Sequence, residues 1–179
     1  MSFVGLIEAS IRLLNQVDLK RIVALTTVIE TNWLLICLSV GSSDLEAIGL
    51  ALVFVHAATT SIEFSMVEFV YKLSGTRSVL AVGGLSASSP QLASIGWLTC
   101  LITIGLPGTS IFSMKFLFFT AFIKFNIILA FFLFIVFFLV LPVFFIRIWL
   151  LVLSGPAASR GLGNELTLAE LAVVLVPIC

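Results

Sequence analysis

The feature that most constrains this chain is a long apolar run, from about Leu92 to Ile123, that Gly105-Leu106-Pro107-Gly108 interrupts. Proline lacks a backbone donor and glycine readily leaves helical geometry, so this sequence breaks or kinks a helix. The freed backbone groups cannot face lipid, so neighbouring helices or water must cover them. Lys115 follows about two turns later, and a cation near the centre of a bilayer costs about 3 kcal/mol even on the mildest scale. A broken helix with a buried lysine is typical of an ion or proton path. The alternative is a proline kink whose lysine extends to the membrane surface.

Composition places the chain in a membrane. Of its 179 residues, 61% are hydrophobic and 10% are charged, whereas a soluble domain is roughly half apolar and a quarter charged. The net charge of zero excludes a polybasic nucleic-acid binder. Three scattered cysteines and one histidine predict no bound metal, haem or iron–sulfur centre. The chain also lacks the glycine-rich motifs that hold nucleotide phosphates. We therefore expect an all-α integral membrane protein.

The apolar segments predict about six transmembrane helices in a single membrane domain, 1–179. Their expected ranges are about 1–16, 21–40, 45–73, 92–123 with a break near 105–109, 127–153 and 166–178. The first and last are short for a complete span. Lys20, Arg21, Lys72 and Arg77 fall at one end of these helices, and the positive-inside rule assigns that end to the cytoplasm or matrix.

Four ionisable residues fall well inside predicted spans: Glu30, His56, Glu63 and Lys115. Glu63 follows His56 by two turns, which puts both on one helix face about 10 Å apart. Imidazole titrates near neutral pH and can both take up and release protons. The charge of a lysine in a low-dielectric site depends on its neighbours, so a nearby carboxylate can switch it. This set of groups is suited to proton movement. The alternative is a set of buried ion pairs that only fix helix packing.

Five motifs occur in an order that indicates a known family. They are Asp18-Leu19-Lys20-Arg21-Ile22-Val23-Ala24, Val55-His56-Ala57, Thr76-Arg77 with Gly83-Gly84-Leu85 behind it, Leu106-Pro107-Gly108-Thr109-Ser110, and Asn164-Glu165-Leu166-Thr167-Leu168-Ala169-Glu170. Together they resemble the C-terminal portion of chain 4 of respiratory NADH:ubiquinone oxidoreductase (complex I), an antiporter-like membrane subunit. The resemblance covers about Val17 to Pro177 and implies the second five-helix repeat of such a subunit.

The resemblance also implies a function. The expected protein is a membrane-arm subunit of the proton-pumping complex, contributing half of an antiporter-like translocation unit and carrying no redox site or cofactor itself. NAD, FMN, iron–sulfur clusters and ubiquinone are expected elsewhere in the complex. The implied partners are lipid, other membrane-arm subunits and a separate chain that supplies the missing N-terminal half; nucleic acid is not among them. The implied location is the mitochondrial inner membrane or, alternatively, a bacterial plasma membrane.

The resemblance assigns roles residue by residue. Lys115 is the expected central or exit-side proton site, His56 its relay, and Lys20 a polar residue near the positive face. Pro107 and Gly108 form the helix break. At Lys115 the family's chain 4 usually has glutamate, and its sister subunits 2 and 5 generally have lysine.

Two carboxylates are particular to this sequence. Glu30 stands where the family commonly has histidine, and Glu63 where it has an apolar residue. We include both in the expected proton pathway and interpret them as compensation for the lysine. Two rival functions stay open: a subunit of a multisubunit cation/proton antiporter, and a structural membrane-arm remnant that no longer conducts protons.

Overall fold

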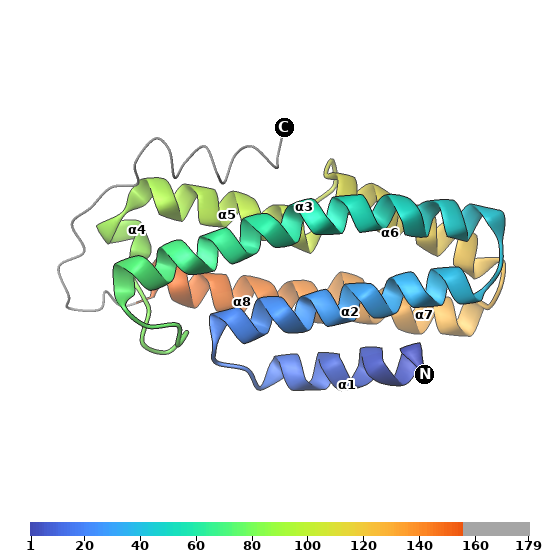
Figure 1. Cartoon of the computed structure of the whole chain (residues 1–179), viewed down its shortest axis with the longest axis horizontal. Helices are drawn as coiled ribbons and strands as arrows, with labels where there is room; N and C mark the ends of the chain where they lie inside the picture. Colours follow the sequence, from blue (N-terminus) through green and yellow to red (C-terminus); the bar gives the residue numbers. More distant parts are fainter. Residues whose placement is uncertain (156–179) are drawn as a thin grey trace.

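The computed structural model describes residues 1–155, and all the regular elements in that range are helical (Figure 1). They are α1 (Ser2–Leu14), α2 (Leu19–Ser39), α3 (Ser43–Ser74), α4 (Leu85–Ser88), α5 (Pro90–Ile104), α6 (Ser110–Ile123), α7 (Ile127–Ile135), the π-helical segment η1 (Val136–Val140) and α8 (Leu141–Ser154). The helix expected at 166–178 lies outside the described residues.

Three helical stretches of the described chain are long and apolar enough to cross a membrane. They are α2, α3 and the continuous stretch Ile127–Ser154, which joins α7, η1 and α8. The shorter apolar helices α5 and α6 follow one another on either side of a break. The predicted all-helical membrane fold with one broken helix is therefore confirmed.

The long helices lie roughly antiparallel in one bundle, with α1 against α2 on its outer side (Figure 1). Helix α3 contacts α2, α5 and α6, while α8 packs against α5 and α7 against α6. This arrangement brings the middle of α2, the middle of α3 and the second turn of α6 into the interior of the bundle, whereas Leu106, Pro107 and Gly108 of the break are exposed.

Side-chain caps set where the two long N-terminal helices begin. The Asp18 carboxylate accepts from the amide of Lys20 at 2.9 Å, and the Ser42 hydroxyl accepts from the amide of Leu45 at 3.4 Å. Because a cap satisfies the free donors of the first turn, α2 and α3 each begin two residues earlier than predicted. Helix α3 ends at Gly75, whose φ of 68° is a left-handed conformation that glycine adopts without strain.

The loop between α3 and α5 is more ordered than the sequence indicates. It contains α4, and Ser78 forms an isolated antiparallel bridge with Asp18. The amide of Leu19 bonds the carbonyl of Arg77 at 3.0 Å. This pairing holds the loop against the start of α2.

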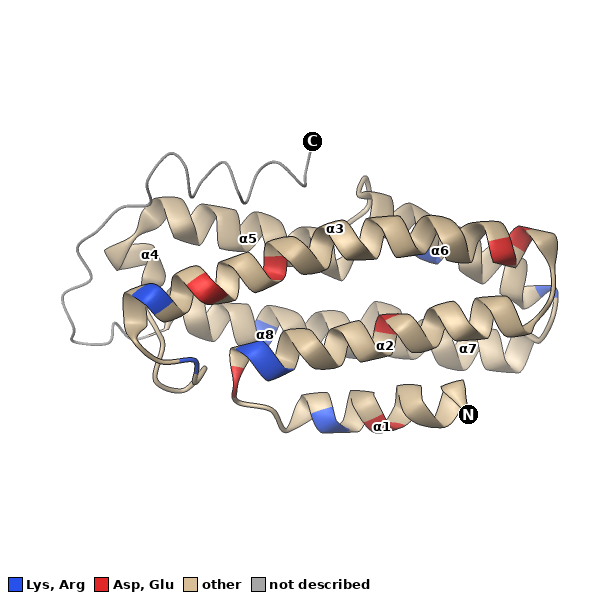
Figure 2. Cartoon of the chain, in the orientation of Figure 1, with Lys and Arg blue, Asp and Glu red and all other residues tan. Residues whose placement is uncertain are grey.

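Basic residues gather at that end of the bundle (Figure 2). The first turn of α2 contributes Lys20 and Arg21, the last turn of α3 contributes Lys72, and Arg77 lies in the paired loop. Arg147 is exposed on α8 seven residues before the helix ends, so its long side chain can extend toward the same polar surface. These positions agree with the end that the positive-inside rule assigns to the cytoplasm or matrix.

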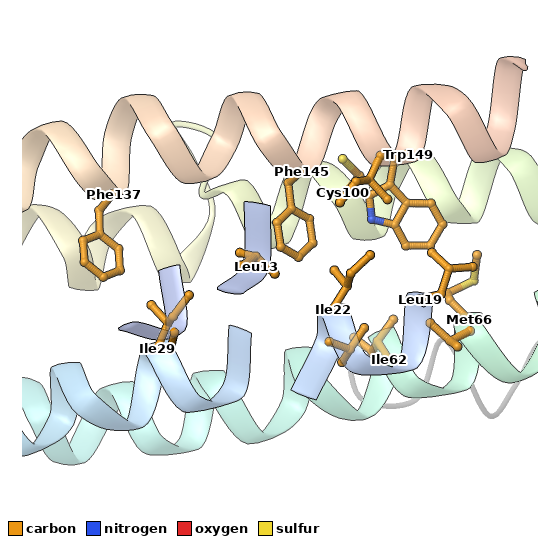
Figure 3. Close-up of a cluster of buried hydrophobic side chains, with 14 of the residues drawn as sticks. Leu13, Leu19, Ile22, Ile29, Ile62, Met66, Cys100, Phe137, Phe145 and Trp149 are labelled. Atoms are coloured by element: carbon orange, nitrogen blue, oxygen red, sulfur yellow. The ribbon is translucent and has the colours of Figure 1, made fainter. Parts of the chain in front are cut away.

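Close packing between α3, α5 and α8 fills the interior at this end with apolar side chains (Figure 3). A Cβ atom at Gly96 would lie 3.1 Å from a methyl group of Leu153 and 3.2 Å from the methyl group of Met66. Contacts this short require the neighbours to shift. The absence of a side chain at Gly96 therefore sets how closely α5 approaches the other two helices.

The replacement Gly96→Val is expected to destabilise the protein by about 1–3 kcal/mol, because added carbons overpack a filled core. The midpoint of thermal denaturation in detergent measures this effect. Ala24→Val, at an exposed position of α2, is the matched control and should leave the midpoint nearly unchanged. Equal midpoints for the two variants would contradict the packing described here.

Candidate functional site

The break between α5 and α6 forms hydrogen bonds within its own segment. Gly105 ends α5 with φ 81°, and Gly108 has φ 106°. The amides of Gly105 and Leu106 bond the carbonyls of Ile102 and Leu101, at 3.0 and 3.1 Å. The sequence led us to expect that neighbouring helices or water would cover these groups. These two amides are instead covered by the last turn of α5, because left-handed glycines let the chain fold back on itself.

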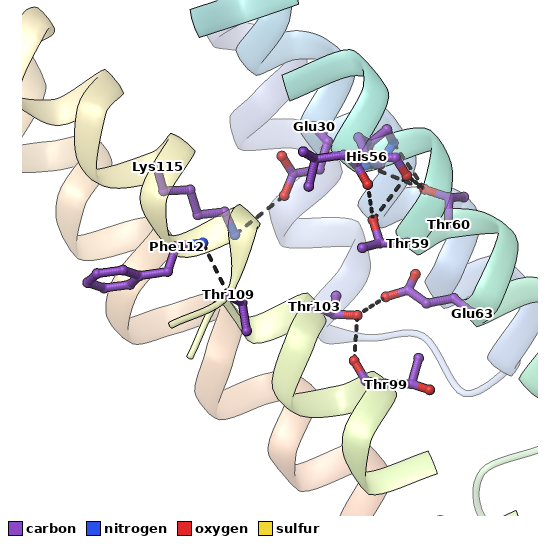
Figure 4. A network of polar contacts seen from close by, with 11 residues as sticks. Glu30, His56, Thr59, Thr60, Glu63, Thr99, Thr103, Thr109, Phe112 and Lys115 are labelled. Atoms are coloured by element: carbon purple, nitrogen blue, oxygen red, sulfur yellow. Dashed lines mark hydrogen bonds and ion pairs between the residues drawn. The ribbon is translucent and has the colours of Figure 1, made fainter. Parts of the chain in front are cut away.

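Thr109 starts the second half-helix. Its hydroxyl accepts from the amide of Phe112 at 3.3 Å, which caps α6. Lys115 follows in the second turn of α6 and points into the bundle (Figure 4). The cap and the two glycines thus fix the direction in which the lysine leaves the break.

Lys115 forms a buried ion pair with Glu30 of α2 (Figure 4). The distance from Nζ to Oε1 is 3.5 Å, and the two side chains are only 8% and 19% exposed. In such surroundings a charge is costly unless it is paired. The pair joins the broken helix to α2 across the interior of the bundle.

His56 of α3 lies near this pair, and its ring is drawn beside Thr60 (Figure 4). It interacts electrostatically with both Glu30 and Lys115. The Thr60 hydroxyl lies 3.4 Å from Nδ1 and 3.3 Å from Nε2 of the ring, and it donates to the backbone carbonyl of His56 at 2.7 Å. The imidazole therefore stands between the ion pair and a hydroxyl group of its own helix.

Glu63 lies two turns further along α3 and is 3% exposed. The Thr103 hydroxyl of α5 donates to its Oε1 at 2.5 Å (Figure 4). Thr103 is two residues before Gly105, the residue that ends α5. The Glu63 carboxylate is thus held by α5, the helix that ends at the break.

One partly open cavity of about 40 Å³ connects these groups. At about 15 Å³ for each molecule, it has room for two or three waters. Its polar lining comes from α2, α3, α5 and α6, and consists of Thr26, Glu30, His56, Thr59, Thr60, Glu63, Thr103 and Lys115. The cavity therefore offers a polar path between helices that are otherwise packed by apolar side chains.

A second, smaller cavity of about 10 Å³ lies on the other side of the ion pair. Glu30, Leu52 and Lys115 line both cavities. The small cavity continues toward the end of the bundle where α2 stops and α3 starts, past Trp33 and Ile48. The ion pair accordingly sits at the junction between a polar cavity and a narrow, mostly apolar one.

The π-helical segment shapes the wall beneath the lysine. Pro142 follows η1, lacks an amide hydrogen and clashes with the carbonyl four residues earlier in a regular helix, which favours the wider π turn. Phe137 of η1 lines the polar cavity, and its ring centroid lies 5.7 Å from Nζ of Lys115. The same ring packs edge-on against Trp33, with centroids 3.9 Å apart. An aromatic wall thus closes the site on this side.

The structure brings together four of the five predicted pathway residues. Glu30, His56, Glu63 and Lys115 line the same cavity. Lys20 does not: it is exposed in the first turn of α2, ten residues or about 15 Å along the helix from Glu30. Within residues 1–155, no group of three or more His, Cys, Asp and Glu side chains is placed to hold a metal ion.

Two elements of the site were missed from the sequence. Thr103 is separated from its partner Glu63 by 40 residues, and neither spacing nor composition marks that contact. Phe137 is one of seventeen phenylalanines, so only the proline five residues later could have drawn attention to it. Both depend on how the helices pack.

The comparisons with known proteins agree with this arrangement. A profile of the family described as "NADH:quinone oxidoreductase/Mrp antiporter, TM" matches residues 1–150, which is more than half of the chain. The chain belongs to this family. The resemblance to complex I chain 4 found in the sequence is thereby confirmed as that of a partial antiporter-like subunit.

Curated members of the NADH:quinone oxidoreductase/Mrp antiporter family include similar proteins from mitochondria-bearing and bacterial organisms. NADH-ubiquinone oxidoreductase chain 4 of Paramecium tetraurelia is 34% identical over 115 residues, covering 64% of this chain and 24% of the relative. Chain 4 of Arabidopsis thaliana is 33% identical over 119 residues, covering 65% and 24%. Subunit M of NADH-quinone oxidoreductase from Rickettsia bellii is 27% identical over 128 residues, covering 72% and 26%. The chain spans about a quarter of the length of these relatives.

A solved structure shows the same fold. A chain of respiratory complex I from Thermus thermophilus with bound NADH superimposes with a TM-score of 0.81 over 99% of this chain and 37% of that chain, at 20% sequence identity. The helical arrangement of Figure 1 therefore also occurs in a chain of that complex.

Proposed function

We propose that this chain is part of an antiporter-like subunit in the membrane arm of a proton-translocating NADH:quinone oxidoreductase. The observation that carries the proposal is the ion pair of Glu30 and Lys115, which lies near a helix break and lines two neighbouring cavities. A structural remnant would need neither a cavity with room for water nor a histidine and a second carboxylate on its wall. The names of the curated relatives support the assignment to complex I.

In this proposal the charge on Lys115 is controlled by its partner. At 3.5 Å the Glu30 carboxylate stabilises the ammonium form. Separation of the two groups, or neutralisation of Glu30, removes that stabilisation and favours release of the proton from Nζ. Water in the polar cavity or the His56 ring then accepts the proton, because imidazole can bind a proton on one nitrogen and release one from the other. Oxidation of NADH and reduction of quinone, carried out by other chains, supply the energy.

The bundle described here makes up only part of a translocation unit, since the segment it shares with the relatives covers 24% of their length. The proposal therefore includes further antiporter-like helices that pack against this bundle and continue the path from Lys115. These helices belong either to the same polypeptide or, as the sequence led us to expect, to a separate chain. The mass of the purified subunit distinguishes the two arrangements. The proposed location is an energy-conserving membrane: the mitochondrial inner membrane or its bacterial counterpart.

The family description also covers Mrp-type antiporters, and purification of the intact assembly separates the two functions. We expect an affinity-tagged chain to copurify from mild detergent with partners that contain flavin and iron–sulfur clusters, and the preparation to oxidise NADH. Isolation with membrane subunits only, without flavin, iron–sulfur clusters or NADH oxidation, would contradict the proposal and favour the cation/proton antiporter. A tagged, unrelated membrane protein from the same membranes serves as the control.

A further inference from the structure

The Glu63 carboxylate occupies an unusual position in the polar cavity. It is 3% exposed, and its partner among the described residues is a neutral hydroxyl group, that of Thr103. The other carboxylate of the cavity, Glu30, has the ammonium group of Lys115 beside it. A buried carboxyl group held by an alcohol needs an explanation, because burial of polar groups is tolerated only when their hydrogen bonds are complete.

The Thr103 hydroxyl has one hydrogen and two acceptors within reach. Its oxygen lies 2.5 Å from Oε1 of Glu63 and 2.9 Å from the backbone carbonyl of Thr99, one turn earlier on α5. A hydroxyl group donates one hydrogen bond and accepts up to two. The single hydrogen can therefore point to either acceptor while the oxygen stays in place.

We propose that the Glu63–Thr103–Thr99 network makes Glu63 a reversible proton-loading site at the helix break, with Thr103 as its positioning residue. When Glu63 is ionised, the Thr103 hydroxyl donates to the carboxylate. When a hydronium ion in the cavity protonates Oε1, one of its O–H bonds breaks and neutral water remains. The new O–H bond on Glu63 donates to the Thr103 oxygen. The Thr103 hydrogen then turns to the Thr99 carbonyl. No covalent bond of Thr103 breaks, and Oε1 of Glu63, the Thr103 oxygen and the Thr99 carbonyl each keep a partner in both states.

The geometry favours this interpretation over a purely structural hydrogen bond. A separation of 2.5 Å is in the range of strong hydrogen bonds between a hydroxyl and a charged oxygen. Thr103 also lies on the last turn of α5 before the left-handed Gly105, so movement at the break changes the reach of its hydroxyl. The network thereby connects the protonation state of Glu63 to the position of the broken helix.

The surroundings of Glu63 contain several other titratable groups. Glu30 on α2, Lys115 on α6 and Cys100 on α5 interact with it electrostatically. His56 lies on the same helix and lines the same cavity. These neighbours influence the pH at which Glu63 takes up a proton. Thr103 determines whether both protonation states of Glu63 have a hydrogen-bond partner.

The inference rests on the proposed function in one respect: the proposed function supplies the path by which a proton released from Glu63 leaves the site. Its test is therefore independent of proton pumping. Infrared difference spectra of the intact complex, recorded between high and low pH, report protonation of individual carboxyl groups through the carbonyl stretching band of the acid form. The wild-type spectrum should contain such a band that Glu63→Gln removes.

Variants of Thr103 test the positioning role. Thr103→Val removes the hydroxyl at constant volume and should shift or abolish the Glu63 band, whereas Thr103→Ser should restore it. Thr103→Ala replaces the valine variant if that protein does not assemble. Thr60→Val is the matched control, because Thr60 lines the same cavity but its hydroxyl bonds to His56. It should leave the Glu63 band in place.

Two results would overturn the inference: a wild-type spectrum with no band sensitive to Glu63→Gln, or an identical band in wild type and in the variants that lack the Thr103 hydroxyl. A Glu63 band that responds to Thr103 in a complex that pumps no protons would support the inference and refute the proposed function.

Discussion

Replacement of Glu30 by alanine is expected to destabilise the assembled chain by about 3–5 kcal/mol. Lys115 would then remain buried, with its side chain 8% exposed, without the carboxylate that now lies 3.5 Å away. Removal of one member of a buried pair leaves an uncompensated charge, which costs far more than the pair contributes. The expected result is a lower midpoint of thermal denaturation and less of the chain recovered in the purified complex.

Two further variants separate this effect from a general loss of packing. In the double variant Glu30→Ala with Lys115→Met, neither charge is left unpaired, so most of the lost stability should return. Glu8→Ala is the matched control: Glu8 also forms an ion pair, with Arg12 at 2.6 Å, but both side chains are more than half exposed. Its loss should cost about 1 kcal/mol or less. Equal destabilisation by Glu8→Ala and Glu30→Ala would show that Lys115 and Glu30 are not a buried pair.

The general fold could be predicted because a membrane imposes simple rules on a sequence. Long apolar runs must be helices, since every backbone group in lipid needs a partner within the protein. The sequence Gly105-Leu106-Pro107-Gly108 then had to interrupt one of them. The positions of Glu30, His56 and Lys115 well inside predicted spans could also be seen in the sequence, and the structure puts these three side chains around one cavity.

The remaining features depend on contacts between residues far apart in the chain. The bridge between Asp18 and Ser78 orders a loop whose glycine and serine content indicated an irregular segment. The π-helical η1 interrupts a helix whose composition is uniformly apolar, so hydropathy carries no sign of it. The hydrogen bond from Thr103 to Glu63 joins α5 to α3. The rotation of one helix relative to the other depends on their packing and cannot be predicted from the sequence of either helix. Lys20 lies outside the cavity, about 15 Å along α2 from Glu30 and near the positive face as expected, so its place in the path stays a prediction.

The replacement Lys115→Ala is expected to remove most of the proton translocation carried by this subunit. Lys115 is the group at which the polar cavity and the small cavity meet. Without its ammonium group, no titratable side chain of α6 remains beside Glu30 among the described residues. The unpaired Glu30 side chain is 19% exposed, against 8% for Lys115, so solvent reaches its charge more readily than that of an unpaired Lys115. The complex should therefore still assemble and transfer electrons while pumping fewer protons.

The most direct test is the number of protons translocated for each NADH oxidised, measured in sealed vesicles that contain the complex. Lys124→Ala is the control, because Lys124 is an exposed lysine directly after the last residue of α6. We predict a lower ratio for Lys115→Ala than for Lys124→Ala, at comparable rates of NADH oxidation and comparable amounts of assembled chain. The same ratio in both variants would contradict a proton-carrying role for Lys115.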